Sequence, residues 1–304
     1  MNVLSLFDGI SCAQVALERA GITPHTYYAA EVDRYAIQIT QHNYPSTVQL
    51  GDVTRWREWD IDWSSIGLLI GGSPCQGFSF SGKQLAFNDP RSRLFFVYVD
   101  ILNHIRRVNP DVKFLLENVK MKKESLDVIS KHLGVEPVFI NSSLLSAQNR
   151  QRLYWANWSF GQPEDKGIVL ADILENGVTD REKSFCIDAN YFKGGTLEQY
   201  FEKSRRQLIF QRSRGFNSGG FMALDGKCPT LGSNSWEQNN FLATVDGFRK
   251  LTPVECERLQ TLNSGFTLIT NEDGKQLVSN TQRYKALGNG FTVDVIAHIL
   301  RCMQ

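Results

Sequence analysis

A cysteine directly follows a proline at Pro74-Cys75, after a glycine pair at 71–72. Such a turn can hold a side chain exposed, and an exposed thiol can be activated as a thiolate nucleophile. A free cysteine is more often a small buried hydrophobe, and we keep that interpretation for Cys12, Cys186, Cys228, Cys256 and Cys302. Cys75 differs because a polar segment, 76–88, follows it at once.

Acidic residues follow successive predicted strands. Asp8 comes after the first strand, Glu31 after the second and Asp52 after the third, while Glu117 ends a later one. Each of these acids alone could be a helix cap or a turn residue. Together they favour a nucleoside ligand, because carboxylates bind ribose hydroxyls and amino groups. Gly9 is followed by Ile10-Ser11-Cys12 rather than by a full GxGxxG run, so a pyrophosphate cradle is poorly supported.

Short apolar runs alternate with amphipathic stretches through the first half of the chain, and they predict the elements that position these residues. We expect strands at 2–7, 27–30, 48–50, 67–72, 112–116, 138–140 and 152–155. We expect helices at 13–20, 34–42, 91–108, 123–132, 253–262 and 292–303, the last one capped by Thr292. This alternation predicts an α/β fold with a doubly wound, mostly parallel sheet. Ligands bind beyond the carboxyl ends of such strands, so the acids and Cys75 should converge there.

The character of the sequence changes after about residue 157. Ser, Asn and Gly become frequent and the alternation stops, which predicts a second, smaller domain at 158–248. Basic residues crowd one part of it: Lys203, Arg205, Arg206, Arg212 and Arg214. They could contact phosphates and base edges of a nucleic acid, or they could form a solvated surface strip.

The composition excludes several classes of protein. Lys and Arg number 33 and Asp and Glu 32, so the chain lacks the positive charge of a histone-like protein, although a local basic strip can still bind nucleic acid. The cysteines form no CxxC pair, so we expect neither a zinc site nor a disulfide framework. No apolar stretch approaches the roughly 20 residues that span a bilayer, and no secretory leader is visible.

The order and spacing of these motifs match a known family: the chain resembles the cytosine-5 DNA methyltransferases. The matching segments are Phe7-Asp8-Gly9, 71–79, Glu117-Asn118-Val119, 148–152, 249–260 and Gly288-Asn289-Gly290. The resemblance implies a Rossmann-like methyltransferase fold, with a catalytic domain at 1–157 and 249–304 and a target recognition domain at 158–248. The compact length resembles bacterial or phage enzymes, and Phe-Asp-Gly-Ile with 93–96 resembles the animal de novo branch. It therefore implies a cytoplasmic enzyme of a bacterial or phage-infected cell, monomeric or weakly dimeric, without a metal.

Two departures from the family pattern concern the shape of the cofactor pocket. Ser11-Cys12 stands where many members carry a glycine. The last motif reads Asn289-Gly290-Phe291, where a small residue and a valine are more usual.

The resemblance also implies a role for each site residue. Cys75 would attack carbon 6 of cytosine, and Glu117, protonated or sharing a proton, would hold ring nitrogen 3. Arg152 would bond the exocyclic oxygen, and Arg150 would support the loop or a phosphate. A base inside a duplex cannot present carbon 6 to a thiol, so the enzyme would flip the cytosine out of double-stranded DNA.

The implied cofactor is S-adenosylmethionine, with S-adenosylhomocysteine as the product. Phe7 would pack against adenine, Glu31 would hold the ribose and Asp52 the adenine amino group. The rest of the pocket would be lined by Asp8, Gly9, Ile10, Val32, Val53, Leu94 and Asn289. The residues expected at DNA are Gln76, Ser79, Arg205, Arg206, Arg212 and Arg214.

Three alternatives remain. A transfer-RNA cytosine methyltransferase shares the fold, but its members usually carry Pro-Pro-Cys-Gln and a Cys-Phe-Thr triplet, whereas Ser73 precedes Pro74 here and the triplet is missing. A catalytically inactive homologue that only binds a partner would have lost residues such as Cys75 or Glu117. A dinucleotide oxidoreductase would need the phosphate fingerprint that this chain lacks.

Overall fold

The computed structural model describes residues 1–74, 93–210 and 248–303, and its centre is a seven-stranded sheet. The strands are β1 (Asn2–Leu6), β2 (Tyr27–Ala30), β3 (Val48–Gln49), β4 (Ile66–Gly71), β5 (Lys113–Val119), β6 (Val138–Asn141) and β7 (Gln151–Ala156). Their order is β3-β2-β1-β4-β5-β7-β6. All neighbours are parallel except β7, which runs antiparallel to both β5 and β6. The predicted mostly parallel sheet is confirmed.

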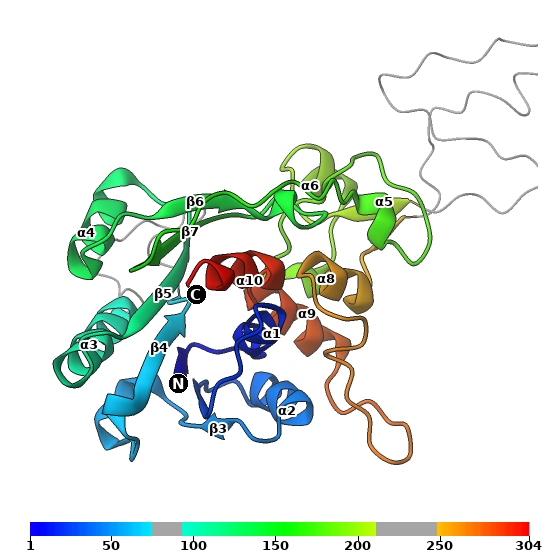
Figure 1. Cartoon of the computed structure of the whole chain (residues 1–304). Coiled ribbons are helices and arrows are strands. Elements are labelled where there is room, and N and C mark those ends of the chain that lie inside the picture. Colours follow the sequence, from blue (N-terminus) through cyan, green and yellow to red (C-terminus); the bar gives the residue numbers. More distant parts are fainter. Residues whose placement is uncertain (75–92, 211–247, 304) are drawn as a thin grey trace, which may run out of the picture.

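Helices cover both faces of this sheet. On one face lie α1 (Cys12–Arg19), α2 (Arg34–Asn43) and α10 (Val293–Arg301), and on the other lie α3 (Arg93–Val108) and α4 (Lys123–Leu133) (Figure 1). Neighbouring strand residues point to opposite faces, so Val3 packs with α1 and α10 while Leu4 and Leu6 pack with α3 and α4. Strands that are apolar on both faces are typical of a doubly wound sheet, as the sequence predicted.

The C-terminal helices differ most from the expectation. The helix expected at 253–262 is α8 (Pro253–Leu259), which ends early because Gln260 turns its side chain inward and Thr261 adopts a left-handed backbone with φ 56°. Helix α9 (Asn280–Asn289) was not expected, because its apolar pattern is weak and rests mainly on Tyr284 and Leu287. Thr292 stands at the N-cap position of the last helix, as predicted, but its side chain makes no capping hydrogen bond: its hydroxyl donates to Gln260 Oε1 at 3.0 Å.

The described part of the region after residue 157 packs directly on the sheet domain. It contains the short helices α5 (Leu170–Ile173) and α6 (Leu197–Phe201) and the strand β8 (Leu208–Phe210), which pairs antiparallel with β9 (Phe248–Lys250). Leu170, Ile173 and Ile187 belong to the same apolar cluster as α1 and α10. This segment therefore shares the main core, and β8–β9 spans the expected boundary at 248. The division into two domains stays a prediction.

Candidate active site

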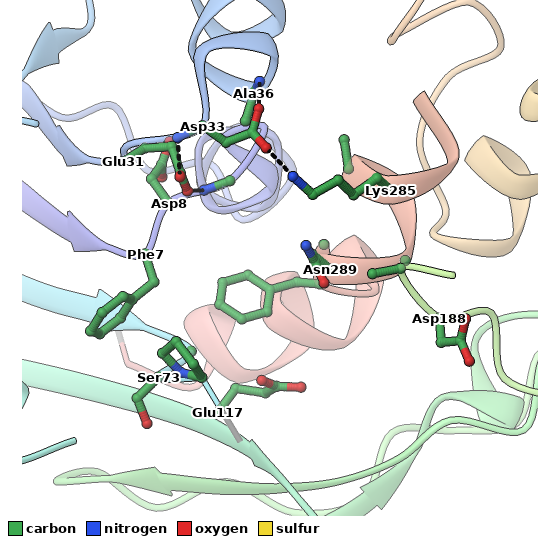
Figure 2. Close-up of a pocket in the computed structure, with 18 of the residues that line it drawn as sticks. Phe7, Asp8, Glu31, Asp33, Ala36, Ser73, Glu117, Asp188, Lys285 and Asn289 are labelled. Carbon is green, nitrogen blue, oxygen red and sulfur yellow. Dashed lines mark hydrogen bonds and ion pairs between the residues drawn. The ribbon is translucent and has the colours of Figure 1, made fainter. Parts of the chain in front are cut away.

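A cavity of about 670 Å³ opens at the carboxyl ends of the central strands (Figure 2). Its lining includes residues from the end of every strand that the sequence singled out: Phe7, Asp8, Gly9, Glu31, Val32, Asp52, Val53, Gly72, Ser73, Pro74, Glu117 and Asn118. Leu94 at the start of α3 and Asn289 at the end of α9 complete the expected set. The fold thus brings the residues expected around the cofactor to one place, except for Ile10, whose side chain is fully buried in the core.

The loop after β1 forms one edge of the cavity in an unusual backbone conformation. Phe7, Gly9 and Ser11 all have a positive φ, of 57°, 62° and 56°. This conformation costs a residue with a side chain about 1–2 kcal/mol. Hydrogen bonds hold the loop in place: the Asp8 amide donates to the Ala30 carbonyl at 3.2 Å, and the Gly9 amide donates to Glu31 Oε2 at 2.8 Å. Strain of this kind concentrates at functional sites, because it fixes a shape before a ligand binds.

Asp8 stabilises this loop from within. Its carboxylate accepts hydrogen bonds from the Ser11 hydroxyl and, at 2.6 Å, from the Tyr27 hydroxyl. Burial raises the pKa of Asp8 to about 6, although the hydrogen bonds from Ser11 and Tyr27 favour the charged form. Asp8 reaches the cavity edge, but its carboxylate is already occupied by the protein.

Glu31 joins the loops after β1 and β2. Its Oε1 accepts from the amides of Val32 and Asp33, both at 2.8 Å, and its Oε2 accepts from the Gly9 amide. Asp52 likewise caps the 3-10 helix η1 (Val53–Glu58) through the Thr54 amide at 2.8 Å. The capping role and a ligand role are compatible, because Glu31 Oε2 can accept a second bond beside the Gly9 amide and the cap at Asp52 uses Oδ1.

The side chains around these two acids fit a nucleoside. Val32 lines the cavity with 71% of its surface exposed, and Val53 and Phe7 line it nearby. Exposed apolar surface beside carboxylates offers stacking contacts for a base together with acceptors for hydroxyl and amino groups.

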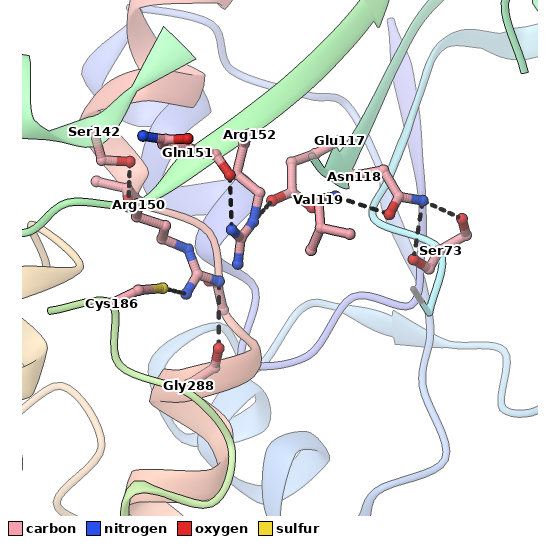
Figure 3. A network of polar contacts seen from close by, with 12 residues as sticks. Ser73, Glu117, Asn118, Val119, Ser142, Arg150, Gln151, Arg152, Cys186 and Gly288 are labelled. Atoms are coloured by element: carbon pink, nitrogen blue, oxygen red, sulfur yellow. Dashed lines mark hydrogen bonds and ion pairs between the residues drawn. The ribbon is translucent and has the colours of Figure 1, made fainter. Parts of the chain in front are cut away.

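The predicted acid and one predicted arginine lie side by side further along the cavity. Arg152 Nε donates to Glu117 Oε1 at 2.8 Å, and only 15% and 13% of the two side chains are exposed (Figure 3). The contact depends on the antiparallel pairing of β5 and β7, which places Arg152 opposite Val119 and Tyr154 opposite Glu117. The next residue, Asn118, donates to the Ser73 hydroxyl at 3.1 Å and so ties β5 to the turn before Pro74.

Arg150, two residues before Arg152, is occupied in a different way. Its guanidinium is buried and donates to the carbonyls of Ile187 at 3.0 Å, Gly290 at 2.9 Å and Gly288 at 3.3 Å (Figure 3). It thus joins the start of β7 to the 186–188 segment and to the end of α9. A guanidinium held in this way supports a loop, and the alternative role that we expected, a contact to a DNA phosphate, is not supported.

Several residues of the cavity were not expected from the sequence. Lys285 pairs with Asp33 across the rim, with Nζ 2.6 Å from Oδ2, and Asp188 enters from the irregular region (Figure 2). Gly288 makes that entry possible, because a Cβ there would lie 2.2 Å from the Asp188 carbonyl carbon. No local pattern marks Asp188 or Lys285. Phe291 also lines the cavity, and its departure from the family pattern was the one available signal.

The residues expected at DNA are only partly described. Arg205 is exposed and lines the cavity, whereas Arg206 has a positive φ of 57° and donates to the Gly194 carbonyl. The other expected contacts, Gln76, Ser79, Arg212 and Arg214, lie outside the described residues, as does the predicted nucleophile Cys75.

Within residues 1–74, 93–210 and 248–303, no group of three or more His, Cys, Asp and Glu side chains could hold a metal ion. Over the same ranges, no helix is long and apolar enough to cross a membrane.

A doubly wound, mostly parallel sheet with a cavity at its strand ends is the fold of the Rossmann-like methyltransferases. The whole chain, residues 1–304, matches the family described as C-5 cytosine-specific DNA methylase. The protein belongs to this family and is a DNA cytosine-5 methyltransferase.

Relatives of known activity cover nearly all of the chain. The type II methyltransferase M.NlaX of Neisseria lactamica is 30% identical over 324 residues, which include 100% of this chain and 96% of the relative. M.HhaI of Haemophilus parahaemolyticus is 27% identical, over 98% of this chain and 93% of the relative.

Solved structures show the same fold. The Entamoeba histolytica methyltransferase EhMeth has a TM-score of 0.66 at 18% identity, over 100% of this chain and 97% of that one. A mutant of DNMT2 from Spodoptera frugiperda has a TM-score of 0.62 at 19% identity, over 99% of both chains.

Proposed function

We propose that this enzyme methylates carbon 5 of a cytosine flipped out of double-stranded DNA, within a specific sequence, through a covalent adduct of Cys75. The observation that carries the proposal is the Glu117–Arg152 pair in the same cavity as Glu31 and Asp52. A base-binding pair and a nucleoside-binding end in one cavity suit a transfer between a nucleoside cofactor and a base.

The chemistry assigned to each residue follows from the reactivity of cytosine. Carbon 5 is a poor nucleophile until a thiolate adds to carbon 6, and Cys75 supplies that thiolate. Negative charge then develops toward ring nitrogen 3. Glu117 stabilises this charge by sharing a proton with that nitrogen. Arg152 orients Glu117 and donates to the exocyclic oxygen. Once carbon 5 has accepted the methyl group, it loses its proton to solvent and the Cys75 thiolate is eliminated from carbon 6, which restores the aromatic ring and the enzyme.

The proposed cofactor is S-adenosylmethionine, which supplies an electrophilic methyl group when bound. Glu31 would accept from the ribose hydroxyls and Asp52 from the adenine amino group, with Phe7, Val32 and Val53 against the base. The exposed surface of Val32 and the remaining acceptor sites of the two carboxylates support this assignment.

Reading of the DNA sequence is assigned to the region 158–248. Arg205 supports this assignment, because it is exposed on that region and lines the cavity. The oligomeric state is proposed to be a monomer or a weak dimer.

Bisulfite sequencing of total DNA from a bacterial host that expresses the protein tests the proposal. We expect protected cytosines in one fixed context, and none with Cys75→Ala. Cys302→Ala is the matched control, because Cys302 is exposed and does not line the cavity. Protection that persists in Cys75→Ala would refute the nucleophile. Unmodified DNA together with 5-methylcytosine in transfer RNA would favour the RNA alternative.

A further inference from the structure

We propose that the Phe291 side chain limits the size of the alkyl group that the cofactor can carry on its sulfur, and so selects methyl donors over larger ones. The inference rests on the proposed function, since it assumes an adenosine near Glu31 and a target base near Glu117.

The geometry around Gly72 carries the inference. Phe291 lines the cavity and is 9% exposed. A Cβ on Gly72 would lie 2.9 Å from Cε1 of the Phe291 ring and 3.0 Å from Glu117 Oε2. The edge of the Phe291 ring and the Glu117 carboxylate therefore both lie next to the Gly72 backbone. Because Gly72 has no side chain, the Phe291 ring can lie this close to its backbone. A Cβ on Gly72 would collide with the ring.

The backbone that carries Phe291 is fixed from two sides. Arg150 donates to the Gly290 carbonyl at 2.9 Å. On the other side, Cys12 is 1% exposed, and its Sγ would be 3.1 Å from a Cβ on Gly290. These contacts hold the backbone that carries Phe291, and with 9% of the residue exposed its ring is packed beside Gly72.

The Phe291 ring lies close to Gly72 and Glu117, at the end of the cavity where the target base is proposed to bind. Under the proposed function, the carbon to be transferred must approach a base held by Glu117, and a ring at this position leaves less room for that carbon. A methyl group is the smallest alkyl group that can make this approach. In a closely fitted apolar pocket, one additional methylene changes binding by about 10-fold to 200-fold.

Isothermal titration calorimetry without DNA provides a readout that does not depend on turnover. The ligands are S-adenosylmethionine, its S-ethyl homologue S-adenosylethionine, and S-adenosylhomocysteine. We expect the wild type to bind the ethyl compound at least about tenfold more weakly than the methyl compound. Phe291→Val should bring the two dissociation constants to within about threefold, while its affinity for S-adenosylhomocysteine changes less.

Controls separate a size effect from general loosening of the fold. Phe210→Leu changes a buried phenylalanine on β8 that does not line the cavity, so it should keep the wild-type ratio. If Phe291→Val does not fold, Phe291→Leu should give an intermediate ratio. An unchanged ratio in a folded Phe291 variant that still binds S-adenosylhomocysteine would overturn the inference. A wild type that binds none of the three ligands would instead refute the proposed cofactor.

Discussion

Arg150 and Arg152 allow a direct test of which arginine stabilises the fold and which one takes part in the reaction. They lie two residues apart at the start of β7, yet Arg150 is buried on backbone carbonyls while Arg152 faces the cavity beside Glu117. Replacing each arginine by methionine keeps most of the apolar stem and removes the charged group. We expect Arg150→Met to lose stability first and Arg152→Met to lose activity first.

The expected magnitudes follow from the contacts. Arg150 donates to three carbonyl groups at 2.9–3.3 Å, and hydrogen bonds from a charged group contribute about 1.5–3 kcal/mol each. These contributions are not additive, so we expect Arg150→Met to lower the free energy of unfolding by about 3–5 kcal/mol. This loss corresponds to a fall in melting temperature on the order of 10 °C. The Arg152–Glu117 pair is largely buried but borders the cavity and involves fewer contacts, so its loss should cost less, about 1.5–3 kcal/mol.

Both variants are measured by urea unfolding and by methylation of a DNA substrate. Arg152→Met should lower the urea midpoint less than Arg150→Met does, and it should lose activity by about 100-fold or more. Arg150→Met should unfold at a much lower urea concentration. It should keep much of its methylation activity when the enzyme, freed of S-adenosylhomocysteine, is assayed well below that concentration. Equal losses of stability in the two variants would refute the division of roles.

Three further predictions concern single side chains. Glu117→Gln keeps the shape of the group but not its charge, so turnover should fall about 100-fold or more while calorimetry finds S-adenosylhomocysteine binding unchanged; turnover within twofold of wild type would contradict the assigned role. Gly288→Ala should lower both the melting temperature and cofactor affinity, because its Cβ would overlap the backbone of Asp188; unchanged values would mean that this segment moves away freely. Because the pKa of Asp8 is about 6 in the folded protein and 3.8 ordinarily, the folded state binds the proton more tightly. The Asp8 contribution to the free energy of unfolding should therefore fall by roughly 3 kcal/mol as pH rises from about 4 to 6 and then level off. Asp8→Asn should remove this slope in urea unfolding, and a slope that persists would assign it to other groups.

Much of the sheet was predictable because its signals are local. Buried strands such as β1 and β4 are continuous apolar runs closed by Asp or Gly, and parallel strands deliver their ends to one edge. The convergence of Asp8, Glu31 and Asp52 follows from that rule alone. The roles of Glu117 and Arg152 needed the resemblance, since nothing in their local sequence says that they touch.

The contact between Glu117 and Arg152 needed long-range information of a kind that periodicity does not carry. It requires β7 to insert between β5 and β6 and to run against both of them. Helix α9 was missed for a related reason: its polar sequence is stabilised by tertiary contacts, such as the hydrogen bond from the Tyr284 hydroxyl to the Leu251 carbonyl at 2.7 Å. Intrinsic propensity gives way to packing in such segments.

The two departures from the family pattern show what a residue-by-residue comparison misses. Cys12 lies near the start of the chain and Gly290 near its end, and from the sequence they count as independent changes. In the folded protein the Cys12 sulfur occupies the space into which a side chain at position 290 would project. A Cβ at position 290 would make a tight contact of 3.1 Å with that sulfur, which Gly290 avoids, and Phe291 next to it lines the cavity close to Gly72. The unusual shape of this pocket is therefore one coupled feature built from both ends of the chain.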